Sequence, residues 1–201
     1  MNKGDHTRQV ILDEAARIAS QVGLGGLTIG TLAARTQLSK SGLFAHFRSK
    51  ESLQEQVLAY TTSRFIDLVV RPALQAPRGE PRVRELFERW LAWCRDDLPG
   101  GCLFFQAAME LDDQPGPARD RLVHDQRDWL DTIARVFRTG IDEGAFRPDA
   151  DPAQFAQDLD GVLLAYTLTS RLLRDAVAED RARRAFDALL VAARQPTLVT
   201  P

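Results

Sequence analysis

The stretch Leu27–Leu53 reads LTIGTLAARTQLSKSGLFAHFRSKESL, and it decides how the chain is organised. Thr28 and, eleven residues later, Ser39 stand where helix caps are expected, because a hydroxyl can accept from a backbone N–H one turn on. Leucines flank both caps at the positions of a hydrophobic staple: Leu27 with Leu32, and Leu38 with Leu43. Two capped starts this close predict two short helices and a tight turn at 36–38, the geometry of a helix-turn-helix.

The second predicted helix, from Ser39 to about Phe47, has an inward and an outward side. Leu43 and Phe47 lie four residues apart and can face a core together. The other residues then present a cation, a hydroxyl, an aromatic ring and a methyl group, with an imidazole at the margin. Glycine lets the backbone approach a partner closely, although it costs a helix about 1 kcal/mol. These outward residues are Lys40, Ser41, Gly42, Phe44, Ala45 and His46.

The segment SKSGLFAHFRSKESL resembles the recognition segment of TetR-type transcriptional repressors, whose pattern is close to SKGTLYHHFPSKEAL. The preceding AARIASQVGLGGLTIGTLAARTQLS is similar too, so the resemblance covers about residues 11–53. The sequence departs from the family pattern at Gly42, Phe44 and Ala45, where Thr, Tyr and a polar residue are common. The set of side chains available to read a groove is therefore smaller and less polar than usual.

The resemblance implies an all-α protein with a three-helix helix-turn-helix DNA-binding domain at residues 1–52. A six-helix body at residues 53–201 would then bind an effector and dimerise. The implied partners are a palindromic double-stranded operator, a second copy of the chain, and a small apolar or amphipathic effector that releases the DNA. The residues that the family pattern assigns to positioning on the DNA backbone are Thr28, Ser39, Phe44, His46 and Lys50.

A smaller set of residues is expected to contact the bases directly. A helix in the major groove meets base edges with its first turns, so we expect Lys40, Ser41 and Gly42 there. Ala45 can offer a methyl contact to thymine. The alternative is a helical ligand-binding or interaction module that has lost operator binding through the unusual residues of this helix.

The distribution of charge supports contact with phosphate at one end. Residues 1–52 hold seven Lys/Arg and four Asp/Glu, whereas residues 53–201 hold nineteen and twenty-four, for a net charge of −2. A mildly basic head on an acidic body suits a module that meets nucleic acid only through its head. No apolar run approaches the roughly 18 residues of a membrane span, and the N-terminus lacks a signal-peptide core. We expect a cytoplasmic protein without membrane contact.

Helical periodicity predicts the remaining elements. A supporting helix at 7–22 should precede the helix-turn-helix, and six helices should follow it at about 49–70, 82–97, 102–111, 118–143, 153–176 and 179–194. The first of these should end before Pro72, since proline disfavours a helix at the residue before it. No segment alternates with the two-residue period of a strand, so we predict no sheet.

Aromatic residues are dense in the middle of this body. Each one alone is most simply core, but together they suit a concave apolar pocket with a few polar groups. The resemblance also implies such a pocket for an effector. The candidate residues are Trp90, Trp93, Phe104, Phe105, Met109, Trp129, Phe137 and Tyr166.

The last two predicted helices are candidates for a dimer interface. Gly161 and Ala165 are small residues four apart, which allows a second helix to approach closely. Two recognition helices meet successive major grooves only if they are related by a two-fold axis. The candidate interface residues are Phe155, Leu159, Val162, Leu163, Phe186, Leu189 and Leu190.

Catalytic and redox chemistry have little support in the sequence. The three histidines, His6, His46 and His124, show no metal-binding spacing, and no phosphate loop or nucleophile elbow is present. We therefore expect no catalytic residue, no metal and no cofactor. Cys94 and Cys102 match neither a CxxC pair nor a zinc site, so they are either two buried reduced thiols or a thiol-based redox sensor.

Overall fold

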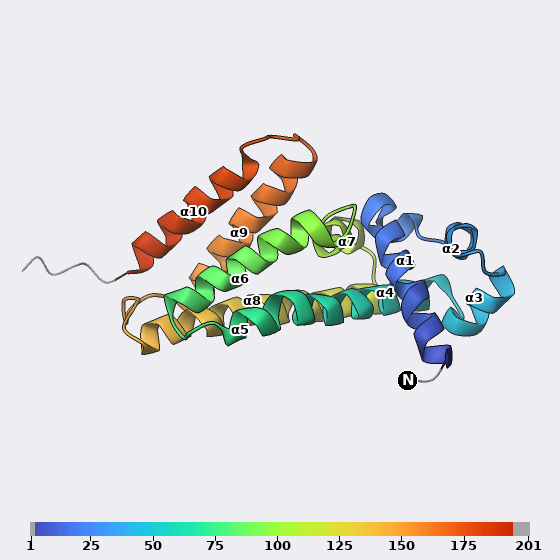
Figure 1. Cartoon of the computed structure of the whole chain (residues 1–201), viewed down its shortest axis with the longest axis horizontal. Coiled ribbons are helices and arrows are strands. Elements are labelled where there is room, and N and C mark those ends of the chain that lie inside the picture. The colour runs from blue at the N-terminus through green and yellow to red at the C-terminus, as the bar shows by residue number, and fades with distance from the viewer. Residues whose placement is uncertain (1–2, 195–201) are drawn as a thin grey trace, which may run out of the picture. The chain divides into compact units, whose positions relative to one another are not determined.

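The computed structural model describes residues 3–194, which fold into helices joined by short connections (Figure 1). Within this range the only strand-like pairing is an isolated bridge between Phe146 and Arg194. The helices α4, η1 and α5 follow one another without a break, as do α6 and η2. Counted so, the described residues form nine helices, and the predicted all-α fold is confirmed.

The described residues divide into two compact units. The first comprises residues up to Ile66 together with Trp93–Gln126, and the second comprises Asp67–Ala92 together with the residues from Arg127 onward. The first unit contains α1 (Lys3–Gly26), α2 (Ile29–Thr36), α3 (Lys40–Phe47), α4 (Lys50–Phe65), η2 (Trp93–Asp97) and α7 (Leu103–Leu111). The second contains α5 (Arg71–Gln75), α6 (Glu80–Ala92), α9 (Pro152–Arg171) and α10 (Ala178–Ala193). Helix α8 (Pro117–Asp142) and the π-helical segment η1 (Ile66–Val70) continue from one unit into the other.

Both predicted caps of the helix-turn-helix are present. Thr28 Oγ1 accepts from the N–H of Thr31, whose own hydroxyl accepts from the N–H of Thr28, so the two residues form a reciprocal capping box. Ser39 Oγ accepts from the N–H of Gly42 at 3.1 Å and starts α3. The first staple is fully buried, but in the second Leu38 stays 37% exposed and covers little of the core.

Contrary to the prediction, the helix that begins at Lys50 does not stop before Pro72. It continues through η1 and α5 to Gln75. Proline lacks an N–H and clashes with the carbonyl four residues back, and the wider turns of a π-helical segment can absorb that missing bond. Helix α9 ends at Arg171, earlier than predicted, and the chain then turns at Arg174 with a φ of 50°.

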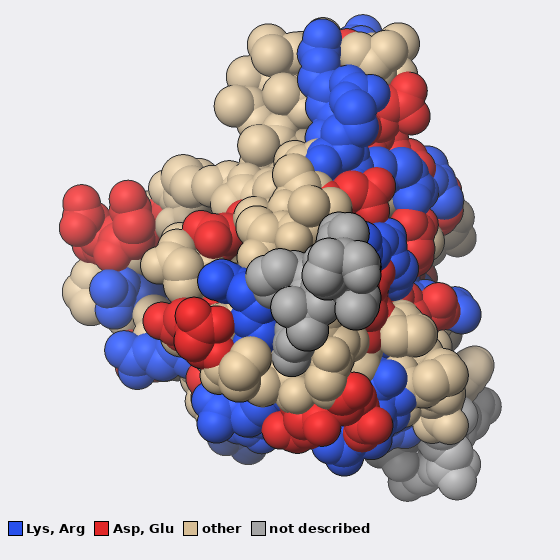
Figure 2. Space-filling model, turned by 90° about the vertical axis from the view of Figure 1, so that its left-hand side faces the viewer, with Lys and Arg blue, Asp and Glu red and all other residues tan. Residues whose placement is uncertain are grey.

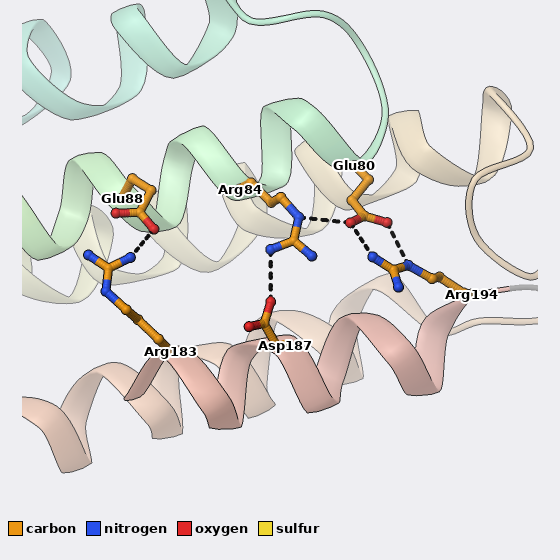
Figure 3. Close-up of polar contacts among 6 residues, drawn as sticks. All are labelled: Glu80, Arg84, Glu88, Arg183, Asp187 and Arg194. Carbon is orange, nitrogen blue, oxygen red and sulfur yellow. Dashed lines mark hydrogen bonds and ion pairs between the residues drawn. The ribbon is translucent and has the colours of Figure 1, made fainter. Parts of the chain in front are cut away.

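Rows of ion pairs fasten α10 to α6 in the second unit (Figure 3). Arg84 bonds Asp187 at 2.8 Å, Arg183 bonds Glu88, and Arg194 bonds Glu80 at 2.6 Å. On the face shown in Figure 2, basic and acidic side chains are likewise interspersed rather than gathered by sign. A face of mixed sign lacks the single-sign basic patch that marks a nucleic-acid-binding surface.

Candidate nucleic-acid interface

Helix α3 has the two sides that its sequence predicts. Leu43 and Phe47 are fully buried in the first unit. Five of the six residues expected to face outward are exposed, Phe44 at 50%, and the sixth, His46, is half-buried. The outward set therefore forms one continuous surface on a capped helix: Lys40, Ser41, Gly42, Phe44 and Ala45.

Some polar groups of this surface already bond within the protein, and others are available to a partner. The hydroxyls of Thr28 and Ser39 are used as caps, so these residues can position the helices but have little left to offer a ligand. Ser41 Oγ lies 3.1 Å from Ser39 Oγ and forms a hydrogen bond with it. Lys40 makes no ion pair with any residue that the structure describes, which leaves its charge available to a partner.

Lys50, the first residue of α4, does not belong to the outward surface of α3. Its Nζ donates to the carbonyl oxygen of Gly25 at 2.7 Å, near the end of α1 and just before α2. There it lines a cavity of about 540 Å³ whose other walls come from the end of α7 and the start of α8. Contact of Lys50 with a DNA phosphate remains a prediction, and one of the three N–H donors of its ammonium group is already bonded to Gly25.

Arg48 is a candidate that the sequence pattern did not single out. It follows α3 directly, its φ is 59°, and its backbone N–H donates to Phe44 O at 3.0 Å. The side chain of Arg48 is exposed, and its guanidinium has no ion pair within residues 3–194. The signal was available in the sequence, because Arg48 is the only arginine between Ser39 and Lys50.

Comparison with known proteins identifies the arrangement. Residues 11–57 match the family model for bacterial regulatory proteins of the tetR family. Residues 79–186, more than half of the chain, match the model for the tetracyclin repressor-like C-terminal domain. The chain belongs to the TetR family.

Named relatives and a solved structure extend the likeness over most of the chain. The transcriptional repressor DhaR of Mycobacterium sp. (strain GP1) is 26% identical over 156 residues, which are 76% of each protein. The repressor KstR2 of Mycobacterium tuberculosis is 27% identical over 150 residues, 72% of this chain and 71% of KstR2. A TetR transcriptional regulator from Chloroflexus aurantiacus J-10-FL superposes with a TM-score of 0.86 at 25% identity, covering 98% and 100% of the two chains.

Membership fixes the general role of the protein. TetR-family proteins are dimeric regulators that bind operator DNA and small-molecule effectors. The protein is thus a DNA-binding transcriptional repressor with an effector ligand. Among the described residues, no helix is long and apolar enough to cross a membrane.

The effector candidates of this TetR-family body fall into both units. In the first unit, the ring of Phe65 meets Trp93 and Phe104 edge-on, at 5.3 and 5.8 Å between centroids. Phe105 is half-buried, whereas Met109 is 69% exposed. On the same helix as Phe104, the buried Gln106 Oε1 has no hydrogen-bond partner within the described residues. Aromatic rings and an unpaired buried acceptor are the kinds of group that an effector with an apolar part and a donor can use.

The effector candidates of the second unit form two separate groups. Trp90 meets Tyr166 edge-on at 6.1 Å, and Trp129 Nε1 donates to Asp160 Oδ1 at 3.2 Å. Burial raises the pKa of the Asp160 carboxyl, and the bond from Trp129 opposes that rise. Phe137 is stacked between Phe146 and Phe155, so both of its faces are filled by the protein's own rings.

The predicted dimer residues lie on the inner side of their helices. Phe155, Leu159, Leu163, Phe186 and Leu190 are buried in the second unit, and Val162 and Leu189 are half-buried. The ring of Phe186 stacks on Phe87 at 4.0 Å between centroids. The apolar residues that α9 and α10 leave exposed are Ala153, Gly161, Leu164, Ala165, Leu168, Ala185, Ala188, Val191 and Ala192.

Both cysteines are free and buried. A hydrogen bond from the Cys94 thiol lowers the pKa of the Cys102 thiol against the effect of burial. Cys102 is the cap residue of α7, and the backbone N–H groups of Phe105 and Phe104 lower the same pKa further. The two thiols are therefore neighbours, which their spacing in the sequence did not reveal.

Proposed function

We propose that two copies of the protein place their α3 helices in successive major grooves of a palindromic operator. The observation that carries this proposal is the outward surface of α3, held between two capped helix starts. Lys40 and Ser41 would read base edges, Gly42 would let the backbone approach them, and Ala45 would contact a thymine methyl. The grooves are about 34 Å apart, which sets the spacing required of the two heads.

Residues around α3 would fix the register without reading sequence. Thr28 and Ser39 hold the helix starts, and Phe44, His46 and Lys50 would meet the sugar–phosphate backbone. Arg48 joins this group, because its charge is exposed and unpaired within the described residues. Most bonds between a protein and DNA are of this positioning kind, and a cation on a phosphate supplies affinity rather than specificity.

The dimer would form through the exposed sides of α9 and α10, opposite the buried sides. On α9 exposed apolar residues recur at 161, 164, 165 and 168, which is one helical stripe. A Cβ at Gly161 would meet no atom within 4 Å, so a partner helix could lie directly against the backbone there. The chain contributes two helices, and two copies would complete a four-helix interface.

The body would take a small apolar or amphipathic effector whose binding weakens the hold on DNA. The aromatic clusters supply the apolar surface, and Gln106 Oε1 offers one acceptor to an effector donor. The protein would act as a regulator in the cytoplasm and catalyse no reaction. Its domain division would place the DNA-binding head at residues 1–52 and the effector-binding and dimerisation body at 53–201.

The test is selection of bound duplexes from a random pool, followed by titration of the selected operator at several salt concentrations. Lys40→Ala should weaken binding and relax the sequence preference at one position of each half-site. Arg48→Ala should weaken binding to all sequences alike. It should also reduce the log–log salt slope by about 0.9 for each phosphate that the variant no longer neutralises. If no palindromic sequence is enriched, or if both variants bind like the wild type, the proposed interface is wrong.

A second candidate is a redox response through Cys94 and Cys102, favoured by the hydrogen bond between their thiols. Hydrogen peroxide would oxidise the two thiols to one disulfide and be reduced to two waters. This predicts that peroxide weakens operator binding, that a thiol reductant restores it, and that Cys102→Ser abolishes the effect. An operator affinity that is unchanged by peroxide would dispose of it.

A further inference from the structure

Helix α1 is broken at Gly23, so that residues 24–28 form the connection from this break to α2. The φ of 78° and ψ of 165° at Gly23 interrupt the helix, so the N–H groups that follow cannot all find carbonyls of α1. Glu110 of α7 supplies the missing acceptors. Its Oε1 accepts from the N–H of Leu24 at 3.2 Å, and its Oε2 accepts from the N–H of Gly25 at 2.7 Å. One carboxylate thus spans two consecutive amides that lie about 85 residues away in sequence.

The fit requires glycine at position 23. A Cβ there would lie 2.2 Å from Glu110 Oε1, so any side chain would push the carboxylate out of place. The carbonyls of the same connection are held from α4. Gln54 Nε2 donates to Leu24 O at 2.8 Å, and Lys50 Nζ donates to Gly25 O at 2.7 Å. The polar groups of this connection are therefore hydrogen-bonded to α7 on one side and to α4, the helix that follows α3, on the other.

Helix α7 is attached to α1 at its other end as well. The N–H of Gly100, just before α7, donates to the buried Ser20 Oγ at 3.0 Å. The approach is so close that a Cβ on Gly100 would fall 1.4 Å from Ser20 O. A movement of α7 must therefore be passed to α1 at Ser20 and to the start of the helix-turn-helix at Glu110. Another side of α7 reaches the aromatic cluster, because Phe104 packs against Phe65.

We propose that Glu110 is a positioning residue that transmits the state of α7 to the helix-turn-helix. The inference rests on the proposed function and names the contact through which the body controls operator affinity. With the carboxylate in place, α2 and α3 are held in one orientation relative to α7, so DNA binds without ordering them. Without it the connection is released on one side, and the head binds DNA with a loss of preorganisation. The clamp lines the 540 Å³ cavity, which gives it room to open.

The test compares the full-length variants Glu110→Ala and Glu110→Gln with Asp113→Asn. Asp113 is an exposed acid of the same region with no ion pair among the described residues, so its variant removes the same charge without touching the clamp. We expect operator affinity to fall about tenfold in Glu110→Ala, within the usual range of coupling between sites. Gln retains a single acceptor and should be intermediate, and Asp113→Asn should bind like the wild type. Amide exchange at Leu24 and Gly25 should accelerate in both Glu110 variants.

A double-mutant cycle separates transmission from simple support of the fold. Phe104→Ala disturbs α7 on the side of the aromatic cluster. Its effect on operator affinity should shrink toward none when Glu110 is also Ala, whereas the two effects on thermal stability should add.

The outcomes are distinguishable. If the wild type binds no selected duplex, the proposed function has failed. If the wild type binds and Glu110→Ala binds equally well, the clamp does not position the head. If the effects of Phe104→Ala and Glu110→Ala on operator affinity simply add, α7 supports the head without transmitting to it, and the inference is also overturned.

Discussion

Arg194 and Glu80 share two hydrogen bonds, from Nε to Oε2 at 2.8 Å and from Nη2 to Oε1 at 2.6 Å. They join the end of α10 to the first turn of α6 (Figure 3). Arg84 Nε donates to the same carboxylate at 2.8 Å. The bond from Arg194 lowers the pKa of Glu80, burial opposes this, and the bond from Arg84 adds to it. The attachment of α10 is thus linked to the ionisation of one carboxylate.

Glu80 should make stability depend on acid pH. Its pKa is lower in the folded than in the unfolded protein, so its contribution is complete above the unfolded value of about 4.5 and is lost as the pH falls through the folded pKa. Glu80→Gln should therefore lower the melting temperature at neutral pH and have a smaller effect at pH 3. Melting curves of both proteins between pH 3 and 7 would show this. A difference that stays constant over that range would contradict the linkage.

Asp160 should behave in the opposite way. Burial raises the pKa of its carboxyl, so ionisation costs folding free energy, and its contribution worsens as the pH rises through the folded pKa. Asp160→Asn removes this cost and leaves an amide oxygen for Trp129 Nε1. We expect the variant to be more stable than the wild type at pH 7, with the gain vanishing near pH 3. A variant less stable at pH 7 would show that the ionised carboxylate has a favourable partner.

Gly42 should separate stability from function. In Gly42→Ala the new methyl would lie 3.2 Å from Ser39 Oγ, a contact that a small shift of the hydroxyl can relieve. Helix propensity favours Ala by about 1 kcal/mol, so the melting temperature should hold or rise. Affinity for the selected operator should nevertheless fall, because the methyl keeps the backbone of α3 from the base edges. Operator titration beside a scrambled duplex tests this, and unchanged operator affinity would remove Gly42 from the interface.

Gly100 should be intolerant of any side chain. In Gly100→Ala the Cβ would overlap the backbone of Ser20, which cannot yield as a flexible side chain would. We expect a loss of at least about 1–3 kcal/mol in the free energy of unfolding, typical of overpacking. Gly4→Ala is the matched control, because its Cβ would meet no atom within 4 Å. Urea unfolding of the two variants should give clearly different midpoints, and equal midpoints would mean that the loop can move away from α1.

The helix-turn-helix could be predicted in detail because its determinants are local. Thr28 and Ser39 cap helices through atoms only three residues away, and Leu43 and Phe47 turn inward by helical spacing alone. The prediction that the helix beginning at Lys50 ends before Pro72 was wrong, because the chain adopts π-helical turns just before the proline and does not stop.

Contacts between segments far apart in the chain could not be predicted from the sequence. Nothing near Glu110 indicates that its carboxylate bonds Leu24, and nothing near Lys50 indicates that its amine turns to Gly25. The dimer residues show a related limit. Periodicity finds the apolar stripe of α9, including Leu163, but such a wide stripe has a core side and a free side. Only packing shows that Leu163 is buried while Leu168 is 53% exposed.

Leu168 lies on the exposed side of α9, and a substitution there tests whether this side forms the dimer interface. Leu168→Asp places a charge on an exposed position, so the protomer should keep its fold, whereas a dimer would have to bury that charge unpaired. Leu68→Asp is the matched control, since Leu68 is 46% exposed and lies on η1, outside α9 and α10. By analytical ultracentrifugation we expect the Leu168 variant to be a helical monomer and the Leu68 variant a dimer. Because two heads must be linked to hold both half-sites, the monomer should also lose most of its operator affinity. A Leu168→Asp protein that remains dimeric would place the interface on another surface.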